Sequence, residues 1–116
     1  MSDITRLDQN ARRSRAVVHG DTVYLGGQTA DDRAADIAGQ TRQVLAKIDE
    51  MLAAAGTDRS KLLNITIWLK SMADFAAMNA VYDAWVVPGQ TPARCCGQVE
   101  LALPEIKVEI MAIAAR

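Results

Sequence analysis

The strongest constraint on the fold is a long amphipathic segment at residues 36–55. Its apolar and small residues recur at steps of three and four, the spacing that places side chains on one stripe of an α-helix. The stripe comprises Ile37, Thr41, Val44, Leu45, Ile48, Met51, Leu52 and Ala55. Asp36 is suited to cap the first turn, and Gly56 can adopt the left-handed conformation that ends a helix. A helix with one apolar stripe must be buried against a second layer.

Segments around this helix predict strands of a sheet. Residues 16–19 and 22–25 flank a Gly-Asp pair and indicate a β-hairpin. Residues 62–69 and 106–115 alternate, which is typical of strands with one buried face. The expected apolar faces are Leu63, Ile65, Ile67 and Leu69 in the first of these segments, and Ile106, Val108, Ile110, Ala112 and Ala114 in the second.

A second helix is expected to run to about Trp85. Ser71 and Asp74 form a capping-box pattern before it, and Pro88-Gly89 ends it. Its stripe would be Phe75, Met78, Tyr82 and Trp85. Residues 93–101 can form a further strand, and residues 1–15 a short edge strand followed by a loop.

The predicted fold class is therefore α+β, in one domain that spans residues 1–116. Two helices with one apolar stripe each can cover only one face of the sheet. The other face would carry Trp68, Met111 and Ile113, which are too apolar for water. Such a face predicts an oligomer.

Composition narrows the class of function. The net charge is -1 and no long basic run is present, which argues against a nucleic-acid partner. No apolar run has the length of a membrane span, and no secretion leader precedes the domain, so a cytoplasmic protein is expected. Cys95 and Cys96 are adjacent and badly placed to bridge each other. No ligand spacing suggests a metal site.

Arg94 and Glu109 are the leading candidates for chemistry. Arg94 follows a proline-fixed turn, and its guanidinium can bind a carboxylate through two parallel hydrogen bonds. It could equally be a surface arginine in an ion pair. Glu109 lies between apolar residues of the final strand, so it either pairs with a cation, even Arg94 itself, or has a raised pKa suited to proton transfer.

Two further features are weaker. Cys95 or Cys96 could be a nucleophile only as a thiolate, whereas free cysteines behave mainly as small buried apolar residues. Gly26 and Gly27 after a strand would let a ligand approach the backbone closely, although a simple chain bend explains them as well.

Several segments together resemble the RidA (YjgF-type) family. The resemblance spans about residues 16–116 in consistent order and is weakest over residues 1–15. Its segments are Gly27-Gln28, Gln40-Thr41-Arg42-Gln43-Val44-Leu45, Ala54-Ala55-Gly56, Asp74-Phe75-Ala76-Ala77-Met78-Asn79, Pro92-Ala93-Arg94, Val108-Glu109-Ile110 and Ala112-Ile113-Ala114.

The resemblance implies a chorismate-mutase-like fold with two helices on one face of a mixed sheet, assembled as a homotrimer with clefts between subunits. It implies hydrolysis of small 2-imino or enamine carboxylates to 2-oxo acids and ammonia, without a metal or organic cofactor. Arg94 matches the family arginine that holds the substrate carboxylate, and Glu109 the glutamate that positions or activates water. Gly27 matches the strand end that lines the cleft, and Cys96 a position near the ligand.

The chain departs from the family pattern at three places. Arg13-Ser14-Arg15 replaces the usual Gly-Pro-Tyr, Gly26 replaces a Ser or Thr, and Met111 replaces a second glutamate. These changes enlarge the expected pocket, and Arg15 could add a second anionic contact. They also leave open a trimer that binds small carboxylates without turnover. RNA cleavage, ascribed to some relatives, is disfavoured by the acidic charge and by the single histidine.

Overall fold

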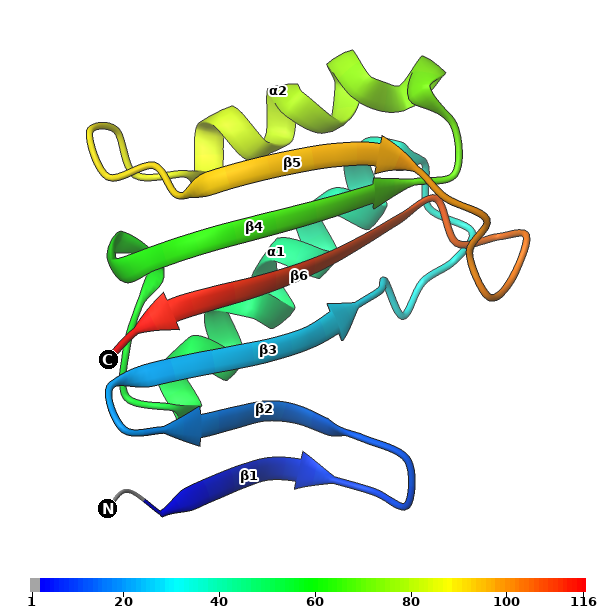
Figure 1. The fold of residues 1–116 in the computed structure, drawn as a ribbon. Helices are drawn as coiled ribbons and strands as arrows, with labels where there is room; N and C mark the ends of the chain where they lie inside the picture. Colours follow the sequence, from blue (N-terminus) through cyan, green and yellow to red (C-terminus); the bar gives the residue numbers. More distant parts are fainter. Residues whose placement is uncertain (1–2) are drawn as a thin grey trace.

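The computed structural model describes residues 3–116 and contains six strands and two α-helices. The strands are β1 (Ile4–Gln9), β2 (Ser14–His19), β3 (Thr22–Gln28), β4 (Leu62–Leu69), β5 (Ala93–Gln98) and β6 (Val108–Ala115), and the helices are α1 (Ile37–Ala54) and α2 (Phe75–Trp85). The strands form one sheet in the order β1-β2-β3-β6-β4-β5 (Figure 1). Only the β4–β5 pair is parallel, so the sheet is mixed, as predicted.

Helix α1 lies behind the middle of the sheet in Figure 1 and forms the core with it. Its start is capped by Asp36, whose carboxylate accepts a hydrogen bond from Gly39 N at 2.8 Å. Gly56 follows its end with φ of 83°, a conformation that favours glycine. The apolar stripe predicted from the sequence is buried except at Ile37, which is half-buried, and within the sheet α1 packs mainly against β6 and β3.

Gln40 ties the start of α1 to the segment that leads into β6. Its side chain is fully buried, its Nε2 donates to the carbonyls of Arg33, Ala35 and Glu105, and its Oε1 accepts from Lys107 N at 3.0 Å. A buried amide with every polar atom bonded stabilises the fold, whereas removing it leaves several backbone groups without partners.

We therefore expect Gln40→Met to lower the free energy of unfolding by about 3 kcal/mol, since the backbone groups that lose their partner remain buried. Chemical denaturation monitored by circular dichroism measures the change. Gln43→Met, on the same helix but bonded only to Asp32 N, is the matched control. Equal losses in the two variants would contradict this role of Gln40.

The strand predictions need correction at their ends. Leu63 was expected in the core but is 50% exposed, because the β4–β6 register shifts between Leu62 and Asn64 and turns Leu62 inward instead. Strand β5 ends at Gln98, and β6 begins at Val108, although Ile106 is buried as expected. Residues 14 and 15, expected in a loop, begin β2.

The start of α2 also differs from the prediction. Ser71 caps a short 3-10 turn, Met72–Asp74, by accepting from Ala73 N, and α2 follows it without a side-chain cap. Phe75, expected on the buried stripe, is 38% exposed, while Met78 and Tyr82 are buried. The turn rotates the first residue of α2 away from the core.

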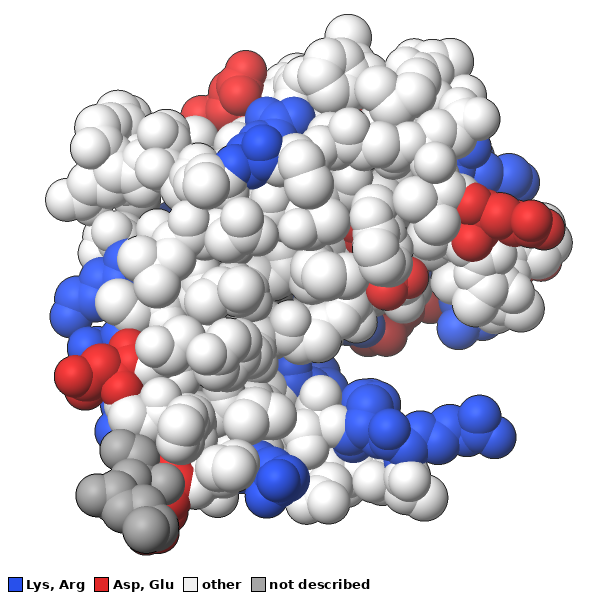
Figure 2. Space-filling model, in the orientation of Figure 1, with Lys and Arg blue, Asp and Glu red and all other residues white. Residues whose placement is uncertain are grey.

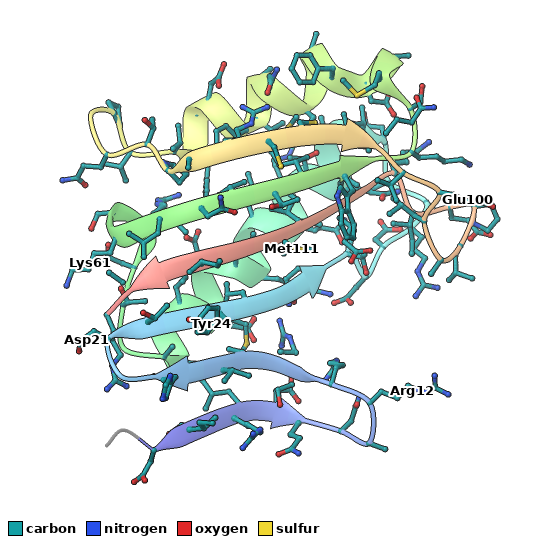
Figure 3. All side chains as sticks on the ribbon, viewed as in Figure 1. Arg12, Asp21, Tyr24, Lys61, Glu100 and Met111 are labelled. Carbon is teal, nitrogen blue, oxygen red and sulfur yellow. The ribbon has the colours of Figure 1, made fainter. Side chains whose placement is uncertain are left out.

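Within residues 3–116, no helix or strand covers the sheet face opposite α1. Figure 3 shows Tyr24 and Met111 in front of the ribbon, on the side away from α1. Tyr24 is 44% exposed, and Trp68, Met111 and Ile113 are half-buried. Along residues 3–116, no helix is both long and apolar enough to span a membrane.

Candidate functional site

Arg94 lies on the edge strand β5, beneath α2. It pairs in register with Ile65, which faces the core, so its side chain points to the helix side of the sheet. Its Nη2 donates to Asn79 Oδ1 at 2.5 Å, and its guanidinium carbon lies 4.6 Å from the ring centroid of Tyr82. Cation–π attraction and one hydrogen bond therefore hold the guanidinium in place.

Arg94 retains donors for a ligand. Of the ion pairs among residues 3–116, none involves Arg94. A guanidinium has five N–H donors, and the bond to Asn79 uses one of them. The arrangement can accept a carboxylate through the remaining donors.

The two cysteines point to opposite faces of β5. Cys96 lies on the same face as Arg94 and packs against the core. Burial raises the pKa of the Cys96 thiol, although the neighbouring Arg94 acts in the opposite direction. Cys95 is exposed on the other face, 3.9 Å from Thr66 Oγ1. A thiol with a raised pKa is a poor nucleophile, so the geometry favours Cys96 as part of a pocket wall.

Glu109 lies on β6, on the sheet face away from α1. It is opposite Trp68 in register and against the backbone of Gly27. A Cβ atom placed on Gly27 would lie 2.0 Å from Glu109 Oε2, so any other residue at this position would force the carboxylate to move. Burial raises the pKa of Glu109, and none of the ion pairs among residues 3–116 involves it. The carboxylate is therefore suited to proton transfer or to holding water.

Arg94 and Glu109 do not meet within one chain. Arg94 shares its face of the sheet with Ile65, whereas Glu109 shares the opposite face with Trp68. The chain thus carries two groups of candidate residues, Arg94 with Asn79 and Cys96 on one side and Glu109 with Gly27 on the other. The salt bridge between Arg94 and Glu109 considered from the sequence is not formed.

Arg15 lies near Gly27 but is already bonded. Its Nε and Nη2 donate to Gln28 Oε1 at 3.3 and 3.2 Å. Its Nη1 lies 3.2 Å from Asp8 Oδ2 and 3.6 Å from Glu50 Oε1. The guanidinium expected to bind a substrate anion therefore contacts two carboxylates and an amide of its own chain.

A polar notch of about 570 Å³ surrounds Arg15. Figure 2 shows it between the tip of the β1–β2 hairpin, where basic side chains project, and the rest of the molecule. Residues of the hairpin, residues 26–29 and two side chains of α1, Lys47 and Glu50, line it. Lys47 Nζ lies 2.7 Å from Asp31 Oδ1, and this bond lowers the pKa of Asp31. Side chains of both charges line this notch and pair with one another.

The three departures from the family pattern lie around Glu109 and Gly27. Ser14 begins β2, and its carbonyl oxygen is 3.4 Å from the position of a Cβ on Gly26, so the space for a side chain there is tight. Met111 is on the same face of β6 as Glu109, two residues further on. All three departures therefore lie in the neighbourhood of Glu109 and Gly27, away from Arg94.

A second hollow, of about 690 Å³, lies between α1 and α2. Small apolar side chains of both helices line most of it, with Trp85 and Arg59 at one side. Arg94, Glu109, Gly27, Cys96 and Arg15 are not among its lining residues. The predicted site therefore lies elsewhere.

Sequence reasoning missed Asn79 and Gln28 as parts of the site. Asn79 is three residues before Tyr82, so both face Arg94 from one side of α2, and this helical spacing was a usable signal. Gln28 directly follows the glycine pair and is 4% exposed. Its burial could not be read from the sequence because it depends on an irregularity of β3.

The fold and these two groups of residues define a small α+β protein of the YjgF type. The family model described as Endoribonuclease L-PSP matches residues 3–116, and the chain belongs to this family, as the resemblance to RidA proteins predicted.

Individual relatives support this family assignment. The RutC family protein YoaB of Escherichia coli is 45% identical over 112 residues, which is 97% of each protein. A solved YjgF family member from Neisseria meningitidis is 41% identical, with a TM-score of 0.96 over 98% of this chain and 95% of that one. The 2-iminobutanoate/2-iminopropanoate deaminase of Escherichia coli is 37% identical over 84 residues, 71% of this chain and 66% of that protein.

Proposed function

We propose that the protein hydrolyses small 2-imino or enamine carboxylates to 2-oxo acids and ammonia. The observation that carries the proposal is Glu109, a carboxyl group with a raised pKa that lies against the Gly27 backbone and outside the ion pairs of the described chain. A relative that covers most of this chain bears the name of such a deaminase. Arg94, with free donors and a fixed position, supplies the anchor for a carboxylate.

The proposed site is formed between subunits of a homotrimer. Arg94, Asn79 and Cys96 lie on one side of the sheet edge, and Glu109 with Gly27 on the other, so two chains are needed to bring them together. The uncovered face with Trp68, Met111 and Ile113 supports an assembly in which the sheets face one another. Residues 1–116 act as one domain in this proposal.

In the proposed reaction, Arg94 and Glu109 have different roles. Arg94 binds the substrate carboxylate and places the imine carbon near Glu109 of the neighbouring chain. For an enamine, the carboxyl group of Glu109 first gives a proton to the β-carbon, which forms the protonated imine and leaves Glu109 as a carboxylate. The Glu109 carboxylate then takes a proton from a water molecule while the oxygen of that water bonds to the imine carbon. In the resulting carbinolamine, the carboxyl group of Glu109 returns this proton to nitrogen, and the hydroxyl group gives its proton to the Glu109 carboxylate as the C–N bond breaks, which releases ammonia and leaves the 2-oxo acid.

The direct test is turnover. Imino acids are generated in situ by an amino-acid oxidase, and the loss of imine is followed by trapping with semicarbazide, with and without the protein. We expect the protein to shorten the lifetime of the imine, and the range of accepted side chains to show the size of the pocket. Lifetimes that the protein does not change, for every imine tried, would contradict the deaminase proposal.

A second candidate is a trimer that binds small carboxylates without turnover. The changed surroundings of Glu109, with Gly26 and Met111 in place of polar family residues, favour it. Saturable binding of a 2-oxo acid, measured by calorimetry and combined with unchanged imine lifetimes, would distinguish it from the enzyme. The cytoplasmic location expected from the sequence stays a prediction.

The assembly makes its own prediction. Met111→Lys places a charge on the uncovered sheet face, and we expect it to convert a trimer into monomers, because burying an unpaired charge at an interface costs several kcal/mol. Light scattering coupled to size-exclusion chromatography gives the mass. Ala53→Lys, on the exposed side of α1, is the control and should leave the mass unchanged. A trimeric Met111→Lys variant would contradict the proposed interface.

A further inference from the structure

Strand β3 contains an extra residue next to Glu109. Between two points of pairing, β3 advances three positions, from Leu25 to Gln28, while β6 advances two, from Ala112 to Ile110. Such a bulge bends one strand and redirects the residues within it. Here the bulged residues are Gly26 and Gly27, so the irregularity sets where the Gly27 backbone lies relative to the carboxylate of Glu109.

The side chain of Gln28 closes this bulge. Its Nε2 donates to the carbonyl of Gly26 at 3.0 Å, two residues earlier in the same strand. Its Oε1 accepts from Nε and Nη2 of Arg15. The residue is 4% exposed, so these bonds are protected from exchange with water. Since the guanidinium can only donate, the amide is fixed in one orientation, with its NH₂ group toward Gly26.

Arg15 is in turn held from the outside. Asp8, from β1, and Glu50, from α1, both form ion pairs with its Nη1. The connected residues thus run from α1 and the edge strand through Arg15 and Gln28 to the bulge. Arg15 occupies the position at which the family resemblance implies a tyrosine in the cleft, yet its N–H donors contact side chains of its own chain.

We infer that Gln28 is a positioning residue for Glu109: its buried amide, oriented by Arg15, holds the Gly26–Gly27 bulge against the Glu109 carboxylate. The inference adds to the proposed function, and its catalytic part rests on that function. It assigns Arg15 a positioning role through Gln28 in place of direct contact with the substrate. Neither Gln28 nor Arg15 touches the reacting atoms.

The geometry gives two ways to loosen the bulge. Gln28→Met keeps the length of the side chain and removes both its donor and its acceptor. Arg15→Met leaves Gln28 in place and removes the group that orients it, at a position less buried than Gln28. Gln43→Met is the matched control, because the amide oxygen of that glutamine accepts from the backbone N–H of Asp32 and lies outside the Arg15–Gln28–Gly26 connection.

The first readout is the titration of Glu109 itself, followed by NMR of protein with ¹³C-labelled glutamate carboxyl groups. The Glu109 signal is identified by its loss in Glu109→Gln. We expect both loosened variants to move the Glu109 midpoint to lower pH, toward an ordinary glutamate, because water reaches the carboxylate once Gly27 can move away. Arg15→Met also removes a positive charge, which alone would raise the midpoint, so a fall separates loosening from a charge effect.

The second readout is turnover. We expect kcat to fall about tenfold in both variants with KM little changed, as for a reacting group displaced by a fraction of an ångström. A folded, assembled Gln28→Met variant with a wild-type Glu109 midpoint would overturn the inference. If Gln28→Met does not fold, an Arg15→Met midpoint that fails to fall would overturn it. The titration needs no substrate, so it tests the positioning role even if the deaminase proposal fails.

Discussion

Arg94→Ala is expected to lower kcat/KM for imine hydrolysis about a thousandfold, since a bidentate, charge-assisted contact to a carboxylate contributes several kcal/mol to transition-state binding. Arg94→Lys should recover only part of this loss. Lysine keeps the charge but lacks the planar fork, and it cannot both bond Asn79 and present two parallel donors to a ligand. The measurement is the rate of imine loss across a range of substrate concentrations for each variant.

Arg59→Ala provides the matched control. Arg59 also stacks on an aromatic ring, with its guanidinium carbon 5.5 Å from the Trp85 ring centroid, but it lies beside the outer hollow between the helices. Removing it takes away a cation–π contact of the same kind without touching the proposed site. An Arg94→Ala variant as active as Arg59→Ala would show that the arginine serves α2 packing and not the substrate.

The order of the elements could be predicted from the sequence because each has a clear period. The stripe of α1 and the alternation of β6 are dictated by burial, and the structure has both where they were expected. Leu63 shows the limit of this reasoning. Its alternation with Ile65 is regular, yet a register shift at the start of β4 turns it outward. Such shifts come from strand pairing and leave no mark on the period.

The candidate site was harder to predict than the fold. Residues 93–98 contain two adjacent cysteines and no alternation, so the sequence could not say which face of β5 carries Arg94. The structure shows that Arg94 lies on the helix side of β5, where it contacts Asn79 and Tyr82. The contact between Gly27 and Glu109 depends on the bulge in β3. Neither Gly27 nor Glu109 can be placed in contact with the other until the register of the strands is known.

Glu109→Gln is expected to lower kcat by about a hundredfold to a thousandfold, the usual contribution of a general base. In the wild-type protein the carboxylate must be ionised to take a proton from water, so imine hydrolysis should rise as the pH rises through the pKa of Glu109. Because burial raises this pKa, the ascending limb should lie above the pH range of an ordinary glutamate. The variant should lose this limb, which a pH–rate profile would reveal.

Stability should change in the opposite direction to activity. The pKa of Glu109 is higher in the folded protein than in the unfolded chain, so ionisation costs stability as the pH rises from the unfolded value through the folded one. Glu109→Gln removes that cost, and we expect it to be the more stable protein at neutral pH and to lose this advantage below the pKa of the unfolded chain.

Glu100, which Figure 3 labels, lies in the exposed loop after β5. As a control, Glu100→Gln should change neither the turnover rate nor the free energy of unfolding. Greater stability in Glu109→Gln together with unchanged turnover would mean that the carboxylate is a strained structural group and would remove it from the mechanism. Lower activity with lower stability would instead indicate that Glu109 is paired in the assembly, most directly with Arg94 of a neighbouring chain. Only the combination of lost activity and gained stability fits a carboxylate held in an apolar place for its chemistry.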